Sequence, residues 1–237
     1  SNLKISLESA LLVLLNLTPF YSEIDLKNFS LNSSETYIIQ HILAFDLKGV
    51  YLENCLFANS LDFSFVELDS FSCNNCSNVE EMLRGMNTLI SLNISNCQVT
   101  SQVTDWIKQN EMLEYFCFSN NYVTSVISFD FLFDFENLSE VNLSNCSLNN
   151  FFLLLDQIDF QLPCSVLNLA KSEMSEKDFE ILCNNFSKLP NLTSLDISDN
   201  LFDVFSLTEN IDQLRFLQEL VIGDYEGDLS DLLDKII

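Results

Sequence analysis

The stretch LTSLDISDNLF, residues 192–202, carries the pattern that decides the fold. It follows the template apolar-x-x-apolar-x-apolar-x-x-(Asn or Cys)-x-apolar. The same template fits LSEVNLSNCSL at residues 138–148, LISLNISNCQV at 89–99 and LEYFCFSNNYV at 113–123. Weaker copies complete a series of nine, whose predicted starts lie near residues 21, 47, 68, 89, 113, 138, 164, 192 and 217. Self-similarity at steps of about 20–29 residues indicates a solenoid of stacked repeats.

Each part of the template has a physical role. The apolar-x-apolar core predicts a short strand whose alternate side chains point inward and stack on those of the next repeat. The Asn or Cys turns inward and satisfies backbone groups where the chain leaves the strand. Because no single repeat can bury its apolar face alone, stability comes from its neighbours.

The rest of each repeat is expected to return along the convex side. Ser175 and Asp178 resemble a helix capping box, and apolar residues follow at helical spacing. Trp106, Ile107 and Met112 indicate a shorter helix. We expect short connections around residues 58–86 and better helices from about residue 101 onward.

These segments resemble leucine-rich repeats, and the longer helix-bearing repeats are similar to the ribonuclease-inhibitor-like and cysteine-containing subfamilies. The resemblance covers about residues 21–227. It implies an α/β solenoid, a right-handed horseshoe with parallel strands on its concave side and helices or short 3₁₀ turns on its convex side. Protein binding is the usual role of such repeats. Repeat length is irregular here and Phe often replaces Leu, so no binding residue of the family is carried over.

The predicted domain organisation is simple. Residues 1–20 are expected to form an N-terminal capping helix or the tail of an earlier repeat, and residues 21–237 form the repeat domain. Near the other end, Leu229, Leu232, Leu233 and Ile236 have helical spacing. A solenoid needs a polar cap, whereas this sequence stops at Ile237. We therefore expect either a longer parent protein or a further segment that covers this end.

The charge balance narrows the classes of partner. The chain has 35 acidic and 10 basic residues, a net charge of −25. No basic patch is possible at this composition, so we do not expect the chain to bind nucleic acid. An anionic surface also repels membranes. Such a surface steers basic partners inward. The alternative is that the charge only keeps a Phe-rich protein soluble.

The cysteines and histidine predict no metal or catalytic site. Cys73-x-x-Cys76 has no second such pair, and the chain has one His, so a four-ligand zinc site cannot be assembled. The repeat register places most cysteines in inward positions, which favours reduced thiols and an intracellular location. Cys117 falls on an outward strand position, so it is the cysteine best placed to react, although we favour the interpretation that it is an unreactive bystander. With four Gly and no placed nucleophile, neither a phosphate loop nor a triad is expected, and no cofactor is predicted.

Ten Asn-x-Ser/Thr sequons point to the opposite compartment. Asn93 and Asn142 lie within predicted strands, where a glycan would block the concave surface. Sequons also arise from the Asn- and Ser-rich repeat pattern itself, so we favour the intracellular reading.

The leading hypothesis is a non-enzymatic interaction module, an adaptor, inhibitor or substrate receptor that binds a basic protein on its acidic concave face. Alternatives are a secreted or cell-surface recognition domain with N-glycans, and a non-catalytic regulator of an enzyme such as a GTPase. The acids lie towards both ends of the predicted face, Lys27 lies among them, and Tyr51 and Tyr115 are its aromatic anchors. The predicted binding residues are Glu23, Asp25, Tyr51, Glu53, Tyr115, Cys117, Glu140, Asn142, Asp196, Asp199, Glu219 and Asp224.

Overall fold

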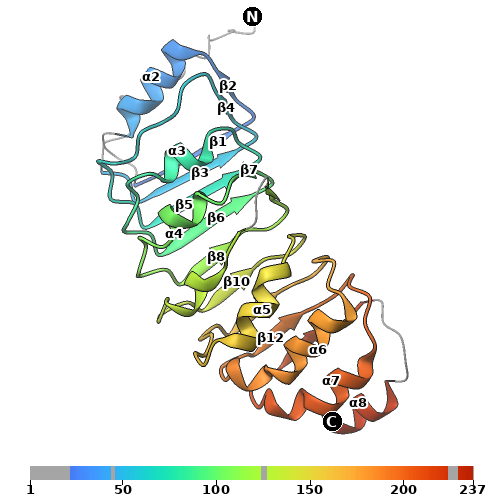
Figure 1. Cartoon of the computed structure of the whole chain (residues 1–237). Helices are drawn as coiled ribbons and strands as arrows, with labels where there is room; N and C mark the ends of the chain where they lie inside the picture. Colours follow the sequence, from blue (N-terminus) through green and yellow to red (C-terminus); the bar gives the residue numbers. More distant parts are fainter. Residues whose placement is uncertain (1–21, 44–45, 124–126, 224–228, 237) are drawn as a thin grey trace, which may run out of the picture.

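The computed structural model describes residues 22–43, 46–123, 127–223 and 229–236. Nine parallel strands form one sheet and follow one another in sequence order (Figure 1). They are β1 (Glu23–Lys27), β3 (Gly49–Glu53), β5 (Ser70–Asn74), β6 (Ser91–Ser95), β8 (Tyr115–Cys117), β10 (Glu140–Asn142), β11 (Val166–Asn168), β12 (Ser194–Asp196) and β13 (Glu219–Val221). Each strand begins two residues after one of the predicted repeat starts. The structure is a leucine-rich-repeat solenoid, which confirms the predicted fold class.

A single hydrophobic core runs along the whole stack. The inward side chains of each strand enter it, and Leu195 and Ile197 are 0% exposed. Most of the largest fully buried side chains are phenylalanines. Phe116 and Phe131 meet edge to face, with ring centroids 5.7 Å apart. This geometry is favourable for aromatic pairs and lets repeats of unequal length fill the same core.

Helical segments cover one face of the sheet, and no described helix or strand covers the opposite face (Figure 1). We refer to this open face as the concave face. The α-helices are α2 (Ser33–Ile42), α3 (Val79–Leu83), α4 (Val103–Ile107), α5 (Asn149–Gln157), α6 (Glu176–Asn184), α7 (Val204–Asn210) and α8 (Ser230–Ile236). Short 3₁₀ helices complete the layer at η2 (Asp130–Phe133), η3 (Phe186–Lys188) and η4 (Ile211–Gln213).

The helix predictions are confirmed in part. Ser175 and Asp178 form the predicted capping box, in which the Asp178 amide donates to Ser175 Oγ at 3.2 Å and the Ser175 amide donates to Asp178 Oδ2 at 3.0 Å. Between residues 58 and 86 the only helix is the short α3, as expected. The shorter helix indicated by Trp106 and Ile107 is α4, whereas the prediction of better helices from residue 101 is wrong for this repeat and the next, whose described residues form no helix besides α4 and η2. Met112 lies outside α4 and is 58% exposed.

The sequence analysis missed α2. Its signal was present, because Asn32 and Glu35 form a complete capping box. Asn32 Oδ1 accepts from the Glu35 amide at 3.1 Å, and Glu35 Oε2 accepts from the Asn32 amide at 2.9 Å. This reciprocal arrangement satisfies free donors at a helix start. The cap and the buried residues Ile39 and Ile42 were sufficient to predict the helix.

The inward Asn or Cys of the template connects consecutive repeats, as predicted. Asn200 Nδ2 donates to the carbonyl oxygens of Leu169 and Ile197, each at 2.9 Å, and its Oδ1 accepts from the Ser172 amide at 2.9 Å. Cys146 occupies the same slot in its own repeat and donates a single hydrogen bond, from Sγ to the Phe118 carbonyl oxygen at 2.9 Å. Buried backbone groups are thus satisfied by a neighbouring repeat.

The two ends of the chain differ in what the structure describes. The capping helix predicted for residues 1–20 lies outside the described residues. At the other end α8 begins at Ser230, where Leu232 is buried and Leu233 is 50% exposed. Within the described ranges, no helix is both long and apolar enough to cross a membrane.

Candidate binding surface

The sheet register brings the predicted concave residues into rows. Asp25 pairs with Tyr51, and the same row continues through Ser72, Asn93, Cys117, Asn142 and Asn168 to Asp196. A parallel row joins Glu23, Gly49, Tyr115, Glu140 and Glu219 with intervening serines and Val166. Residues up to 196 positions apart therefore share one surface. Asp224 lies outside the described residues.

The N-terminal end of this face is acidic and contains one lysine. Lys27 Nζ lies 3.4 Å from Asp25 Oδ2 and 3.2 Å from Glu53 Oε2. These hydrogen bonds, first to Glu53 and then to Asp25, raise the pKa of Lys27. All three side chains are about half exposed, so water screens the pairs and they stabilise the fold little. Glu23 is exposed beside them on β1.

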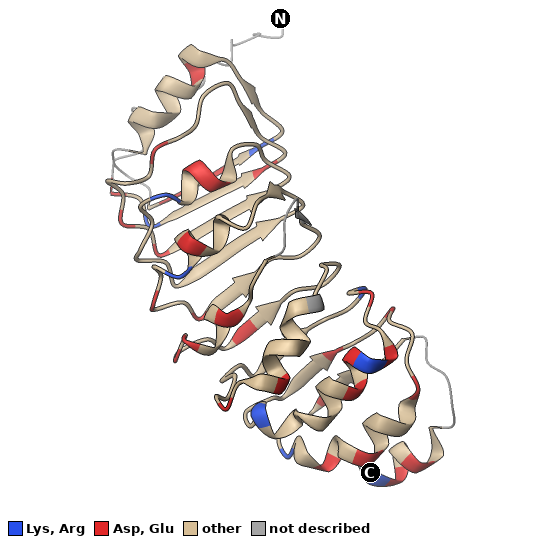
Figure 2. Cartoon of the chain, in the orientation of Figure 1, with Lys and Arg blue, Asp and Glu red and all other residues tan. Residues whose placement is uncertain are grey.

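The C-terminal end of the face carries a second group of acids. Glu219 Oε2 accepts from Ser194 Oγ at 2.8 Å, and Asp196 Oδ2 accepts from Asn168 Nδ2 at 3.2 Å. Glu140 is exposed on β10. Neutral hydrogen-bond partners leave the formal charge of these carboxylates uncompensated. Acidic segments recur along the whole stack, whereas basic ones are few (Figure 2).

The part of the face on β5 and β6, the third and fourth of the nine strands, is uncharged, and we refer to it as the centre because it lies between the two acidic groups. Its outward side chains are three from each strand, all half-buried except the buried Ser95: Ser70, Ser72, Asn74, Ser91, Asn93 and Ser95. Hydroxyl and amide groups can donate and accept hydrogen bonds without a charge to desolvate. The face therefore has two acidic ends and a neutral, hydrogen-bonding centre.

Cys117 corrects one of the predictions. It occupies the predicted outward position, yet it is only 4% exposed. Its Sγ lies 3.6 Å from Ser95 Oγ and 3.4 Å from Ser119 Oγ. The neighbouring Tyr115 is half-buried, and burial together with the Cys117 thiol raises the pKa of its hydroxyl to about 12. The thiol is therefore covered by its neighbours and is a poor candidate for a reactive cysteine.

The rim at the carboxyl ends of the strands contains an asparagine ladder that the sequence analysis did not anticipate. In eight repeats one residue, either the first or the third after the strand, has a positive φ of 53° to 60°, and six of these residues are asparagines. Asn tolerates this left-handed region better than most residues. Their side chains link neighbouring repeats, as when Asn75 Nδ2 donates to Asn54 Oδ1 at 2.7 Å and Asn145 Nδ2 to Asn120 Oδ1 at 2.7 Å.

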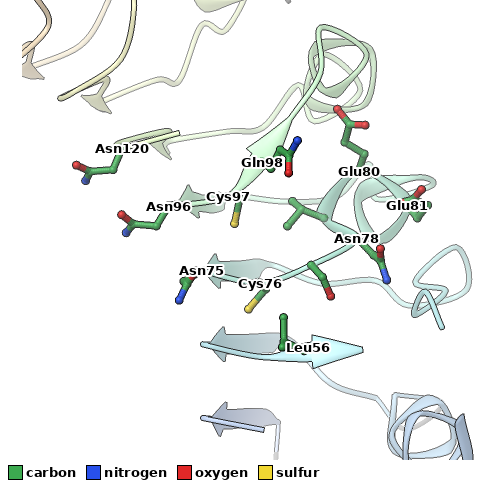
Figure 3. A pocket seen from close by; sticks show the side chains of 12 residues that line it. Leu56, Asn75, Cys76, Asn78, Glu80, Glu81, Asn96, Cys97, Gln98 and Asn120 are labelled. Carbon is green, nitrogen blue, oxygen red and sulfur yellow. The ribbon is translucent and has the colours of Figure 1, made fainter. Parts of the chain in front are cut away.

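Asp199 belongs to this rim and not to the strand face, because its φ is 56° and it pairs with Lys171 at 3.2 Å. A hollow opens on the rim beside Asn75, Asn96 and Asn120, which follow one another from repeat to repeat (Figure 3). It lies between two short rim sheets, β2 (Ser30–Leu31) with β4 (Leu56–Phe57) and β7 (Gln98–Val99) with β9 (Tyr122–Val123).

The chemistry available to this surface is hydrogen bonding and charge. In the described part of the chain, no group of three or more His, Cys, Asp and Glu residues could hold a metal ion. All eight cysteines are buried free thiols. Burial raises the pKa of Cys146 to about 11 and that of Cys164 to about 12. Cys146 and Cys164 therefore stay protonated near neutral pH and belong to the core.

Comparison with known proteins yields only distant structural likeness. No family model matches the sequence, and no curated protein matches it either. Internalin C2 from Listeria monocytogenes is 14% identical, with a TM-score of 0.44 over 92% of this chain and 78% of that chain. A second Listeria monocytogenes internalin is 11% identical, with a TM-score of 0.38 over 92% and 85%.

The leucine-rich-repeat ectodomain of the plant membrane receptor kinase GASSHO1/SCHENGEN3 from Arabidopsis thaliana, solved in complex with CASPARIAN STRIP INTEGRITY FACTOR 2, is 16% identical. Its TM-score is 0.44, and the match covers 83% of this chain but only 28% of the ectodomain. Likeness at this level carries no argument about function. The fold assignment rests on the repeat geometry described above.

Proposed function

We propose that this chain is a non-enzymatic protein-interaction module that binds a basic protein across its concave face, as an adaptor, inhibitor or substrate receptor. Solenoids use extended concave surfaces of this kind for binding. The observation that carries the proposal is the charge pattern of one uncovered sheet face. Carboxylates stand at both ends of that face, and serines and asparagines form its centre.

The physical argument combines attraction and docking. A net charge of −25 accelerates the approach of a basic partner. The two acidic ends then orient it, while the neutral centre offers hydrogen bonds that a partner backbone or side chain can use. Charge complementarity of this type sets association rate and specificity more than total affinity.

A pull-down from cell lysate at low and high salt, read by mass spectrometry, identifies the candidate partner, and a purified partner then permits quantitative tests. We expect neutralisation of concave acids in the triple variant Glu23→Gln, Glu140→Gln, Glu219→Gln to weaken binding about tenfold near physiological salt. The matched control removes the same charge from the helical side, as Glu81→Gln, Glu180→Gln, Glu209→Gln. All three control residues are exposed on helices.

The control is expected to change affinity less than twofold, about 0.4 kcal/mol. Equal losses in the two triple variants would show that only net charge matters. Binding that is insensitive to salt and to both triple variants would contradict the proposal and redirect attention to the helical side.

We also propose a reducing, intracellular location. It is supported by the use of thiols in the inward slot, where Cys97 Sγ donates to the Ser95 carbonyl oxygen at 3.1 Å. The sequons give weaker support to the secreted alternative, because Asn185 is 8% exposed and the amide nitrogens of Asn75 and Asn145 are hydrogen-bonded in the rim ladder. The test is a thiol count and an intact mass on protein from its native source. Eight thiols without glycan support the proposal, and disulfides or occupied sequons overturn it.

A further inference from the structure

We infer that the N-terminal end of the concave face is a seat for an arginine side chain of the partner, built from the Tyr51 ring and the carboxylates of Glu23 and Asp25. The inference rests on the proposed function and names the chemistry of one contact within it. Three observations carry it: the placement of Tyr51 over a glycine, a hollow bounded by that ring and by carboxylates, and a lysine already held in the neighbouring hollow.

Tyr51 lies along its own strand because Gly49 leaves room for it. Gly49 and Tyr51 are alternate residues of β3 and both face the concave side. A Cβ at Gly49 would lie 3.0 Å from Tyr51 Cε2, 3.1 Å from the Tyr51 hydroxyl oxygen and 3.0 Å from Glu23 Cγ. Gly49 is buried as a result. The ring therefore leans over the glycine and beside the Glu23 side chain, instead of projecting away from the sheet.

Two hollows flank this ring. The first is lined by Ser22, Glu23, Ile24, Asp25 and Tyr51. The second shares Asp25 and Tyr51 and adds residues of β1, β3, β5 and β6, among them Lys27 and Glu53. A group that enters the first hollow meets an aromatic ring and two carboxylates together.

Lys27 shows that the carboxylates at this end of the face bind a cation. Its ammonium group lies within 3.4 Å of Asp25 and 3.2 Å of Glu53. The chain itself thus places one cation among the carboxylates of the second hollow. Glu23, in the first hollow, forms no ion pair with any residue in the described ranges. Among the described residues, no cation therefore pairs with the Glu23 carboxylate that lines the first hollow.

The combination favours a guanidinium over an ammonium. A cation against an aromatic ring is attracted by the π-electrons, and Arg makes this contact more often than Lys. Its planar group can stack on Tyr51 and still donate hydrogen bonds to Glu23 and Asp25 through its edge. A Lys side chain gains the charge attraction but neither the stacking nor the paired hydrogen bonds. We therefore expect the seat to prefer Arg at equal charge.

The test compares two peptides of equal charge, hexa-arginine and hexa-lysine, titrated into the whole chain by calorimetry at about 50 mM salt, where exposed charges are weakly screened. We expect the wild-type chain to bind hexa-arginine about fivefold more tightly than hexa-lysine. Tyr51→Leu should reduce this preference to less than about twofold and leave hexa-lysine binding nearly unchanged. Gly49→Ala, which displaces the ring, should lower the preference in the same direction.

Tyr37→Leu is the control, because Tyr37 is a tyrosine of α2, is 64% exposed and lies outside the concave face. It should keep the wild-type preference, and circular dichroism verifies that each variant is folded. A Tyr51→Leu variant that retains the full preference overturns the arginine seat. Equal binding of the two peptides by the wild-type chain overturns it as well, while the proposed acidic interaction surface stands. If neither peptide binds the wild-type chain, the arginine seat and the proposed acidic interaction surface are both overturned.

Discussion

Replacing Asn200 with alanine tests the polar slot that joins each repeat to the next. Asn200 is 2% exposed, and its three shortest hydrogen bonds go to the carbonyl oxygens of Leu169 and Ile197 and the amide of Ser172. Longer ones reach the Ser198 carbonyl oxygen at 3.2 Å and the Met174 amide at 3.4 Å. A buried polar group without its partner costs about 1–3 kcal/mol. Three such groups give a nominal loss of about 3–9 kcal/mol, and water that enters the vacated space recovers part of it. We expect a net loss of about 3 kcal/mol.

The assay is urea unfolding followed by far-ultraviolet circular dichroism. With a slope of about 2–3 kcal/mol/M, the Asn200→Ala midpoint should fall by about 1 M. Fluorescence of the single tryptophan, Trp106, follows the same titration and reports on the repeat that contains α4. Because solenoid repeats contact mainly their neighbours, the C-terminal repeats can unfold first. In that case the circular dichroism midpoint lies at a lower urea concentration than the Trp106 fluorescence midpoint.

Asn200→Cys is the informative comparison, because Cys occupies the same slot at Cys146 and donates one hydrogen bond there. It should lose about half as much stability as Asn200→Ala, since one donor is restored. Asn191→Ala is the surface control and should cost less than about 0.5 kcal/mol. A loss below about 1 kcal/mol for Asn200→Ala, or equal losses for the Ala and Cys variants, would refute the role of the slot in joining repeats.

Three further predictions concern stability. Gly85→Ala should destabilise the chain by about 2 kcal/mol in thermal unfolding. Gly85 has a φ of 89°, and an added Cβ would lie 2.9 Å from the Ser64 Cα atom. An unchanged unfolding temperature would contradict the close packing of Gly85 against Ser64. Asn32→Ala should cost about 1 kcal/mol and increase amide hydrogen exchange in α2, whereas Asn32→Ser should keep most of the cap. The buried thiols make stability depend on alkaline pH. The folded pKa of Cys146, about 11, and that of Cys164, about 12, both exceed the ordinary value of 9.0, so their contribution is complete below pH 9.0 and is lost as pH rises towards 11–12. Urea midpoints at pH 8.0 and about 10.5 should therefore differ, with the lower value at the higher pH, and equal midpoints would count against burial of these thiols.

The strands were the most predictable part of the molecule. Alternation of inward and outward side chains is a local property of extended backbone, so the template located all nine strands without knowledge of their partners. The helical side was less predictable. Segments between strands must fit against neighbouring repeats, and the described residues between 103 and 133 form a short α-helix and a 3₁₀ helix as their only helices. The capping box at Asn32 was visible in the sequence and was overlooked.

The candidate binding surface was predictable in outline and not in detail. The register of the template put acids on the outward positions of the strands, and the structure has six of them there: Glu23, Asp25, Glu53, Glu140, Asp196 and Glu219. Burial of Cys117 could not be predicted this way, because it depends on Ser95 in the preceding strand as well as on its own neighbour Ser119. Asp199 was assigned to the strand face, yet its left-handed backbone places it on the rim.

The sequence by itself determined the repeat, the parallel strands and the side of each strand that faces the core, because these follow from residue types a few positions apart. Only the tertiary structure decided how outward side chains meet across strands. Tyr51 leans over Gly49 beside Glu23, and the rim asparagines bond to partners 21 to 26 residues away. Those contacts depend on the stacking of whole repeats, and irregular repeat lengths make that stacking a property of the folded chain.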